Sequence, residues 1–504
     1  MDVIIQNLPV ALAMGLIGAI IFAIIGVISG TDETATIAPL TLVVILLGVP
    51  PAGVFTFFLA GAISKHMTHA VPTMLLGIPG DTMAVPLLDD ASRMRALGLP
   101  HLALRKAVAG AVLSAFISVP CAVLFAWILS PFGDAISAAA PWIFLAAALG
   151  IAYSSQGKWG AIVALIPFVV LVLGLKAWSQ TYGVKLGTSY FLGIAVGPML
   201  LALATILVPS SRAASRVDKP ATVFLAPDAE LSSSGDHTSA SNMSELDSHN
   251  HSVTDAAANS ASSKHASSAK RGRALYPSPF KILDRQQTRA TAAAATVSSA
   301  TFVFSPVAMT VMVGEIVKSR VKQGYQRLTT MIAAKNGTTE STYIAEALIP
   351  LIAFGLPLSP VAAGPAAPLF NAPPVFETNA ETGAKHNLSS FLSTPEFLVF
   401  GLLSALLAML VAYPFVMRFA HKAAAMSVRK ISHEAIISAF FALVVVVSLW
   451  EGGIVGLAVT LTIGLVGGLL IKVVKLHAGV LFMGYYVAVL SVPGILSALG
   501  VGQM

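Results

Sequence analysis

The chain has 504 residues, of which 56% are hydrophobic and only 11% are charged, and its formal net charge is +7. A soluble domain has about a quarter of its residues charged, so the composition excludes a water-soluble fold and indicates a polytopic membrane protein. The excess of Lys and Arg is expected to set topology through cytoplasmic loops, and it does not indicate nucleic acid binding. The single cysteine, Cys121, excludes an intrachain disulfide or a CxxC metal site, and the 11 histidines show no metal-binding spacing.

Runs free of Asp, Glu, Lys and Arg predict the membrane spans, because about 20 apolar residues cross the hydrocarbon core. The N-terminus has no basic region and no cleavage pattern, so it is expected to be a retained first span. Strand alternation is absent, which favours an all-α bundle of about 10–12 spans. The runs lie at 3–31, 107–133, 135–157, 159–175 and 186–211, and then at 290–314, 397–417, 435–450, 452–471 and 476–504.

The segment between these two sets, 212–289, differs in composition. It is rich in Ser, Ala, Asn, His and charge, and it has almost no bulky apolar residues. Such a segment cannot bury enough surface to offset its chain entropy, so we expect a disordered linker. Basic residues at both of its ends predict a cytoplasmic location. The predicted domains are therefore a membrane half at 1–211, the linker, and a second membrane half at 290–504.

Two apolar stretches, 34–88 and 347–376, do not look like simple spans. Prolines interrupt them at Pro39, Pro50, Pro51, Pro72, Pro79 and Pro86, and at Pro350, Pro357, Pro360, Pro365, Pro368, Pro373 and Pro374. Proline breaks a helix, and irregular backbone is tolerated at membrane depth only inside protein or along a cavity. The stretches are expected to be re-entrant hairpins or broken helices forming a substrate site, and the alternative is ordinary kinked spans with loops.

An internal repeat supports this interpretation. The signature Gly-Thr-x-Glu-(Ser/Thr)-x-x-Ile-Ala occurs at 30–38 and again at 337–345, and each copy is followed by a Gly-x-Pro element, at 77–79 and 355–357. Duplicated halves suit a secondary transporter whose site lies where the halves meet near the bilayer midplane. We expect two repeat halves, in inverted orientation.

The candidate site residues come from these motifs and from three basic residues that precede the first Gly-x-Pro element, which we call the first break. The second Gly-x-Pro element is called the second break. Glycine lets backbone approach a ligand, hydroxyls and freed carbonyls coordinate ions, and basic residues attract an anion or relay protons. The substrate-binding candidates are Gly30, Thr31, Thr34, Lys65, His66, His69, Gly77, Pro79, Gly80, Thr82, Asn336, Gly337, Thr338, Ser341, Gly355, Pro357 and Ser359. The ion-coupling candidates are Asp32, Glu33, Asp81 and Glu340. The alternative is that these are interfacial or solvated loop residues. No nucleophile–base constellation indicates an enzyme.

The chain resembles the large membrane subunit of the tripartite tricarboxylate transporters, the TctA-type permeases. The residues that carry this resemblance are Gly30–Pro39, Leu76–Gly80 leading to Leu88–Asp90, Asn336–Glu340, Ala347–Leu351 and Gly355–Pro357. The sequence departs from the family pattern at Gly30–Thr34, at Thr338–Ser341 and at Pro357–Leu358, and the long linker is extra. The resemblance implies cation-coupled carboxylate uptake with a small four-span subunit and an extracytoplasmic solute-binding protein.

The expected function is therefore secondary transport of a di- or tricarboxylate-like anion across the bacterial cytoplasmic membrane, coupled to Na⁺ or H⁺, without a cofactor. One alternative is a translocase of an anionic lipid, such as a polyprenyl phosphate. Another is a membrane scaffold or membrane enzyme with the linker as its interaction segment. The sequence leaves the substrate and the coupling ion open.

Overall fold

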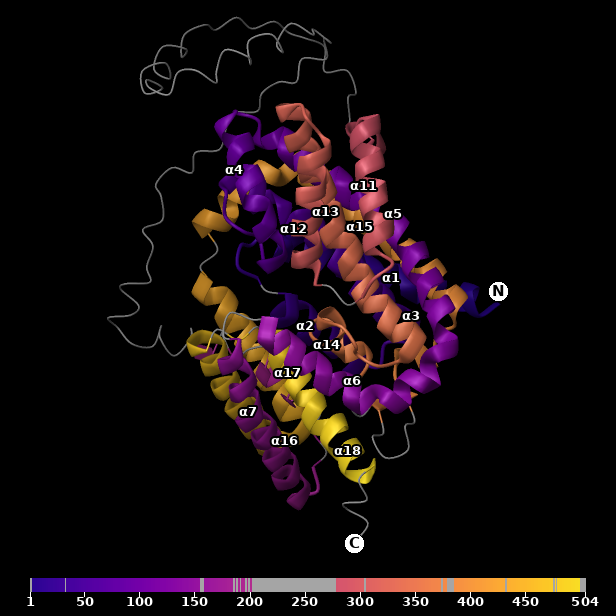
Figure 1. The fold of residues 1–504 in the computed structure, drawn as a ribbon, viewed down its shortest axis with the longest axis vertical. Helices are drawn as coiled ribbons and strands as arrows, with labels where there is room; N and C mark the ends of the chain where they lie inside the picture. The colour runs from indigo at the N-terminus through magenta and orange to yellow at the C-terminus, as the bar shows by residue number, and fades with distance from the viewer. Residues whose placement is uncertain are drawn as a thin grey trace, which may run out of the picture. The chain divides into compact units, whose positions relative to one another are not determined.

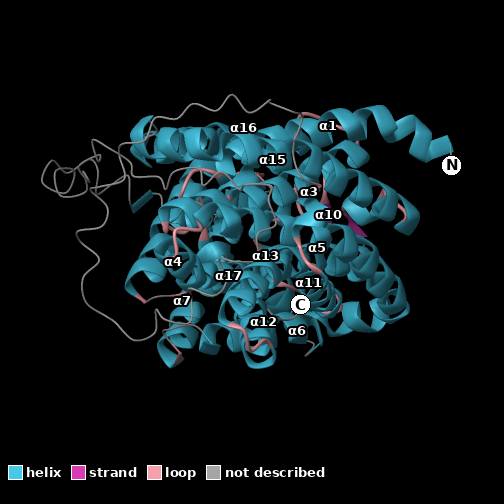
Figure 2. Ribbon diagram, turned by 90° about the horizontal axis from the view of Figure 1, so that it is seen from above, coloured by secondary structure: helices cyan, strands magenta, loops and turns pink. Residues whose placement is uncertain are grey.

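The computed structural model describes residues 2–201 and 278–498, apart from 32, 155–157, 185, 187–188, 191, 195–196, 198–199, 303–304, 373–374, 379–384, 431–432, 475 and 477. Most of the predicted linker, 212–277, and Asp32 lie outside the described residues. The described residues of both predicted halves belong to one compact unit. They are almost all helical, as Figure 2 shows, which confirms the all-α membrane fold.

The first half consists of helices joined by short turns. Gly48, in the left-handed conformation at φ 74°, follows the end of α2, and Pro51 at the first helical position starts α3. The elements are α1 (Asp2–Gly26), α2 (Glu33–Leu46), α3 (Pro51–Thr68), a π-helix (Pro72–Leu76), a 3₁₀ helix (Thr82–Leu87), α4 (Leu88–Ala96), α5 (Pro100–Leu129), a 3₁₀ helix (Ser130–Phe132), α6 (Gly133–Ser154) and α7 (Trp159–Thr181).

The second half is also helical, with one short strand pair, β1 (Glu377–Thr378) against β2 (Lys385–His386), antiparallel with Glu377 opposite His386. Its helices are α10 (Pro279–Ile282), α11 (Arg285–Ser298), α12 (Pro306–Arg320), α13 (Gly324–Ile349), a π-helix (Pro350–Phe354), α14 (Pro360–Ala363), a 3₁₀ helix (Ala367–Leu369), a 3₁₀ helix (Leu388–Ser390), α15 (Thr394–Lys430), α16 (His433–Val473), α17 (Ala478–Tyr486), a π-helix (Val487–Ser491) and α18 (Val492–Ala498).

Five helices of the described chain are long and apolar enough to cross a membrane, fewer than the predicted spans. They are Val3–Gly26, Pro100–Phe132, Trp159–Thr181, Thr394–Ser427 and Phe441–Val473, and three shorter apolar helices accompany them. The run 290–314 is wrong as a single span. It is divided between α11 and α12, because Ser305 caps a new helix with Pro306 at its first position.

The described helices pack as two groups (Figure 1). One group contains α1, α3, α5, α11, α12, α13 and α15, and the other contains α6, α7, α16, α17 and α18. The two short helices that start at the predicted breaks contact both groups. Helix α2 contacts α3 and α16, and α14 contacts α13 and α17. Helices α2 and α14 therefore lie where the two groups meet.

Glycine lets the helices of the first group touch backbone to backbone. A Cβ atom on Gly18 would overlap the carbonyl of Phe57 across the α1–α3 contact, and one on Gly110 would overlap the carbonyl of Ala333 across the α5–α13 contact. In lipid, where helix association has no hydrophobic driving force, such close approach supplies the packing energy.

The two Gly-x-Pro elements adopt the same local structure. Each follows a π-helix that begins at a proline, and Gly77 and Gly355 then take left-handed conformations at φ 71° and 62°. After each Gly-x-Pro element a side chain caps the next helix. Asp81 accepts a hydrogen bond from the Ala84 N–H, and Ser359 accepts one from the Ala362 N–H. The glycines suit these positions because only they adopt a positive φ without strain.

The two copies of the Gly-Thr-x-Glu signature, in contrast, differ in local structure. Gly30 lies in a turn at φ 82° before α2, whereas Gly337 lies inside the continuous helix α13. The Gly-x-Pro elements are thus the better structural evidence for duplication. The inverted orientation of the halves stays a prediction.

The start of α11 joins the first group by polar contacts. Asp284 and Gln287 form a capping box, with Asp284 Oδ1 accepting from the Gln287 N–H at 2.8 Å. Gln326 of α13 donates to Asp284 Oδ2 at 2.5 Å. Partial burial alone would raise the pKa of Asp284, but these hydrogen bonds hold the pKa below its usual value.

Replacing Gly110 with leucine is expected to lower the free energy of unfolding by about 1–3 kcal/mol or more, because the inserted atoms meet backbone. The control is Gly174→Leu on α7, where a Cβ atom meets no heavy atom within 4 Å. The midpoint of thermal unfolding in detergent, followed by intrinsic fluorescence, measures both. Equal midpoints for the two variants would contradict the close α5–α13 contact.

Replacing Asp284 with alanine is expected to cost about 1 kcal/mol of stability at neutral pH, as the loss of a helix cap does. The folded pKa of Asp284 is depressed, so its stabilisation is present above the unfolded pKa of about 3.9 and is lost as the pH falls through the folded pKa. The difference in unfolding midpoint between wild type and Asp284→Ala should therefore shrink in acid. The control is Asp284→Asn, which keeps a helix cap but has no group that titrates. If the difference in unfolding midpoint between wild type and Asp284→Ala did not change with pH, the depressed pKa of Asp284 would be refuted.

Candidate functional site

Three basic side chains at the end of α3 are buried in the first helix group. Lys65 and His69 have no exposed surface, and His66 is 1% exposed. Burial of a charge in apolar surroundings costs several kcal/mol unless partners compensate for it. The site is therefore defined by the groups that surround these three residues.

Asp81, at the end of the first break, pairs with two of them. Lys65 Nζ lies 2.9 Å from Asp81 Oδ2, and His69 Nδ1 lies 3.0 Å from Asp81 Oδ1. Asp81 Oδ1 also accepts from the Ala84 N–H at 3.1 Å. The carboxylate thus caps the 3₁₀ helix and neutralises charge on α3 at once.

His66 connects α3 to α2 and α13. Its Nε2 lies 2.6 Å from Glu33 Oε1 at the start of α2, and its Nδ1 lies 3.2 Å from Glu340 Oε2 of α13. The ring of Tyr343 stands edge-on to His66 at a centroid distance of 4.5 Å. Because both imidazole nitrogens face a carboxylate, the arrangement favours the doubly protonated ring.

His69 is held in the same way. Asn336 of α13 donates through Nδ2 to the Ala107 carbonyl at 2.9 Å, which turns its Oδ1 toward His69 Nε2 at 3.0 Å. With Asp81 at the other nitrogen, both nitrogens of His69 lie within hydrogen-bond distance of side-chain oxygens.

We call these residues the charge cluster. Its members are Glu33, Lys65, His66, His69, Asp81, Asn336 and Glu340, each at most 4% exposed. Three basic side chains face three acidic ones, so the cluster is electrically balanced when all six are charged. Glu340 makes the fewest polar contacts of the three carboxylates, because its one such contact in the described chain joins Oε2 to His66 Nδ1 at 3.2 Å.

The structure brings together the basic candidates and the acidic candidates Glu33, Asp81 and Glu340. It also joins the first signature to the first break, since the Gly30 N–H donates to the Gly80 carbonyl at 2.9 Å and Ser29 Oγ donates to the Pro79 carbonyl at 2.6 Å. A Cβ atom on Gly364 would lie 3.2 Å from Thr34 Oγ1, so the second proline-rich stretch reaches the start of α2.

Several other candidates make local contacts outside the charge cluster. Thr31 Oγ1 donates to the Ile28 carbonyl at 2.9 Å, Thr338 Oγ1 donates to the Ala334 carbonyl at 2.8 Å, and Ser341 bonds Ser298. Gly337 packs against α5, and Thr82 is exposed. Their roles in substrate binding stay predictions.

The second break carries the remaining candidates. The Gly355 carbonyl accepts from Asn387 Nδ2 at 2.7 Å, and Ser359 Oγ donates to the Glu346 carbonyl at 2.7 Å. Pro357 lines a cavity of about 30 Å³ together with Tyr485. Such a volume holds water and not a carboxylate, so a substrate needs this break to open.

Three buried charged residues, Asp90, Lys335 and Glu346, were not among the site candidates predicted from the sequence. Glu346 Oε2 accepts from the Val361 N–H at 3.1 Å, and Lys335 pairs with Asp90 at 2.5 Å. The signal was available, because Lys335 and Glu346 lie in one helical stretch with Glu340, and charged residues at membrane depth indicate function. Because it contains charged residues, that stretch was not among the predicted spans.

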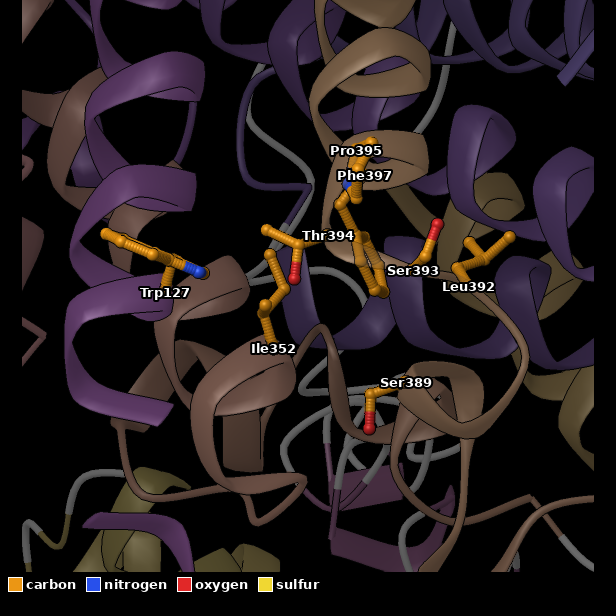
Figure 3. A pocket seen from close by; sticks show the side chains of 8 residues that line it. All are labelled: Trp127, Ile352, Ser389, Leu392, Ser393, Thr394, Pro395 and Phe397. Atoms are coloured by element: carbon orange, nitrogen blue, oxygen red, sulfur yellow. The ribbon is translucent and has the colours of Figure 1, made fainter. Parts of the chain in front are cut away.

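A larger cavity lies at the C-terminal end of α5, as Figure 3 shows. It has a volume of about 570 Å³, and Trp127 of α5 faces it with Ile352 of the π-helix and residues at the start of α15. Its lining is Trp127, Ile352, Ser389, Leu392, Ser393, Thr394, Pro395 and Phe397. These residues carry no charge, so the charge cluster is the better candidate for recognition of an anion.

Comparison with known proteins gives one finding. The model of a family described as "Tripartite tricarboxylate transporter TctA family" matches residues 12–481. No curated protein and no solved structure matches the chain.

Removing one member of the Lys65–Asp81 pair is expected to destabilise the protein by about 3–5 kcal/mol, because the other is left buried and uncompensated. The double variant Lys65→Met/Asp81→Asn restores the balance and should unfold at a higher temperature than either single variant. The exposed pair Lys318–Glu315 is the control, since its removal should cost at most about 1 kcal/mol. If the loss of stability in the double variant equalled the sum of the losses in the two single variants, an interaction between Lys65 and Asp81 would be excluded.

Proposed function

The chain belongs to the tripartite tricarboxylate transporter TctA family and is a membrane component of such a transporter, and we propose that it carries a di- or tricarboxylate inward through the cytoplasmic membrane together with protons. The match also confirms the family resemblance that the Leu76–Gly80 and Ala347–Leu351 motifs indicated. The observation that carries the proposal is the balanced charge cluster with its weakly held Glu340.

Coupling between anion and proton follows from the charge balance of the cluster. A carboxylate that enters a balanced, buried cluster adds a negative charge, and an uncompensated buried charge costs several kcal/mol. One proton on a cluster carboxylate offsets one substrate charge. Binding of the anion and the proton together is then favourable, whereas binding of either one alone is unfavourable. This coupling is the thermodynamic requirement for symport.

Glu340 is the carboxylate best suited to take that proton. Its one polar contact in the described chain is with His66, whereas Asp81 is held by Lys65, His69 and the Ala84 N–H. His66 lies between Glu340 and Glu33, within 3.2 Å and 2.6 Å, so its ring can pass a proton from one to the other. These contacts favour H⁺ over Na⁺, both of which the sequence allowed.

Asp81 indicates where a substrate carboxylate can bind. It offers Lys65 and His69 the same chemical group that the substrate carries. It follows Gly77, which has φ 71°, and a glycine can adopt other backbone conformations at little steric cost because it has no Cβ atom. In the proposed mechanism the substrate carboxylate replaces Asp81 at these two cations when the break opens.

The family name describes a three-part transporter, so we propose that the chain works with a small membrane subunit and an extracytoplasmic solute-binding protein. The binding protein would deliver the anion to the side opposite the basic residues of α4 and the start of α5.

Uptake of labelled citrate into proteoliposomes that contain the chain and its two partners tests the proposal. Wild type should accumulate citrate under an inwardly directed proton gradient, and a sodium gradient at equal pH should add nothing. Glu340→Gln should lower gradient-driven accumulation about tenfold or more, because the variant cannot bind the coupled proton.

Asp284→Asn is the matched control, since it removes an exposed carboxylate outside the cluster and should leave accumulation unchanged. Uptake that follows sodium alone would overturn proton coupling. Failure to move any carboxylate, with movement of a polyprenyl phosphate instead, would overturn the substrate class.

A further inference from the structure

A second charged pocket lies beside the charge cluster, between α4, α12 and α13. Its volume is about 430 Å³, in the range of small-molecule sites. Its charged lining residues are Asp89, Asp90, Arg93, Glu315, Lys318, Arg327 and Lys335. Lys335 directly precedes Asn336, the residue that bonds His69, so the pocket and the charge cluster meet on adjacent positions of α13.

The pocket is lined by four basic and three acidic side chains, which form three ion pairs, so one basic side chain has no acidic partner among them. Arg93 pairs with Asp89 at 2.9 Å and Lys318 pairs with Glu315 at 3.3 Å, both at the exposed rim, where such pairs contribute little. Lys335 pairs with the buried Asp90. Among these lining residues, all within the described chain, Arg327 is the one charge without an ion pair.

Arg327 and Lys335 together fit a carboxylate-bearing anion. A guanidinium binds a carboxylate through two parallel hydrogen bonds. Lys335 is 8% exposed, and its Nζ is held by Asp90 Oδ2 at 2.5 Å and by the Pro86 carbonyl at 3.1 Å. Its present partner is thus a carboxylate, which a second carboxylate can replace.

The pocket lies at the basic end of the first helix group. Arg93 and Arg95 of α4, Lys318 and Arg320 at the end of α12, and Arg327 at the start of α13 are all found there. By the positive-inside rule this end faces the cytoplasm. On the transport path proposed above, an anion that leaves the charge cluster toward the cytoplasm would reach this pocket next.

We propose that this pocket is a second carboxylate-binding site at the cytoplasmic mouth. Arg327 holds one carboxylate of the anion, and Lys335 exchanges Asp90 for another. The identity of the anion rests on the proposed function, whereas the pocket and its free guanidinium do not.

Equilibrium binding of citrate to the purified full chain in detergent, measured by calorimetry, tests the second site. Wild type should bind citrate at a site whose affinity falls about tenfold or more in Arg327→Gln, the usual effect of losing a charge-assisted hydrogen bond. Arg327→Lys keeps the charge without the bidentate geometry and should fall between the two. Arg320→Gln, an exposed basic residue of the same end that does not line the pocket, is the matched control and should bind as wild type does.

The failure of this proposal and of the proposed function can be told apart. Citrate binding that is lost in Arg327→Gln but kept in His66→Gln supports the second site. If wild type also fails to transport citrate in proteoliposomes, the second site stands and the proposed function is refuted. Equal citrate affinity in wild type, Arg327→Gln and Arg327→Lys overturns the second site. Inorganic phosphate that competes as well as citrate overturns its assignment to carboxylates.

Discussion

The balance of buried charge at the end of α3 is the constraint on which the rest of the site depends. Lys65, His66 and His69 are shielded from water, so each must be met by an acceptor from another element. The start of α2 supplies Glu33, the first break supplies Asp81, and α13 supplies Glu340 and Asn336. The positions of these elements relative to α3 are therefore set by electrostatics as much as by packing.

Helix packing makes that arrangement possible. Gly110 lets α5 touch the backbone of α13, and this contact places Asn336 within hydrogen-bond distance of Ala107. The two breaks have a matching role, because each left-handed glycine ends a π-helix and is followed by a polar cap, Asp81 in one and Ser359 in the other. Only the first cap carries a charge, so the duplicated architecture supports an asymmetric site.

Sequence reasoning reached the membrane class, the family and the two broken stretches, because composition and proline spacing are local signals. It also selected Lys65, His66 and Glu340, but not the way they pair. The partners of His66 lie 33 residues away and in the other half of the chain, and no local pattern encodes that contact. Local rules failed where charge was tolerated inside a helix, as at Lys335, and where a cap divided an apolar run, as at Ser305.

The number of protons taken up when a fully ionised dicarboxylate binds tests the central claim most directly. Calorimetry in buffers of different ionisation enthalpy gives that number for wild type and for Glu340→Gln. Uptake of about one proton per added substrate charge in wild type, reduced by one in the variant, is the result that electroneutrality of the cluster predicts. Binding without any proton exchange in either protein would contradict the account.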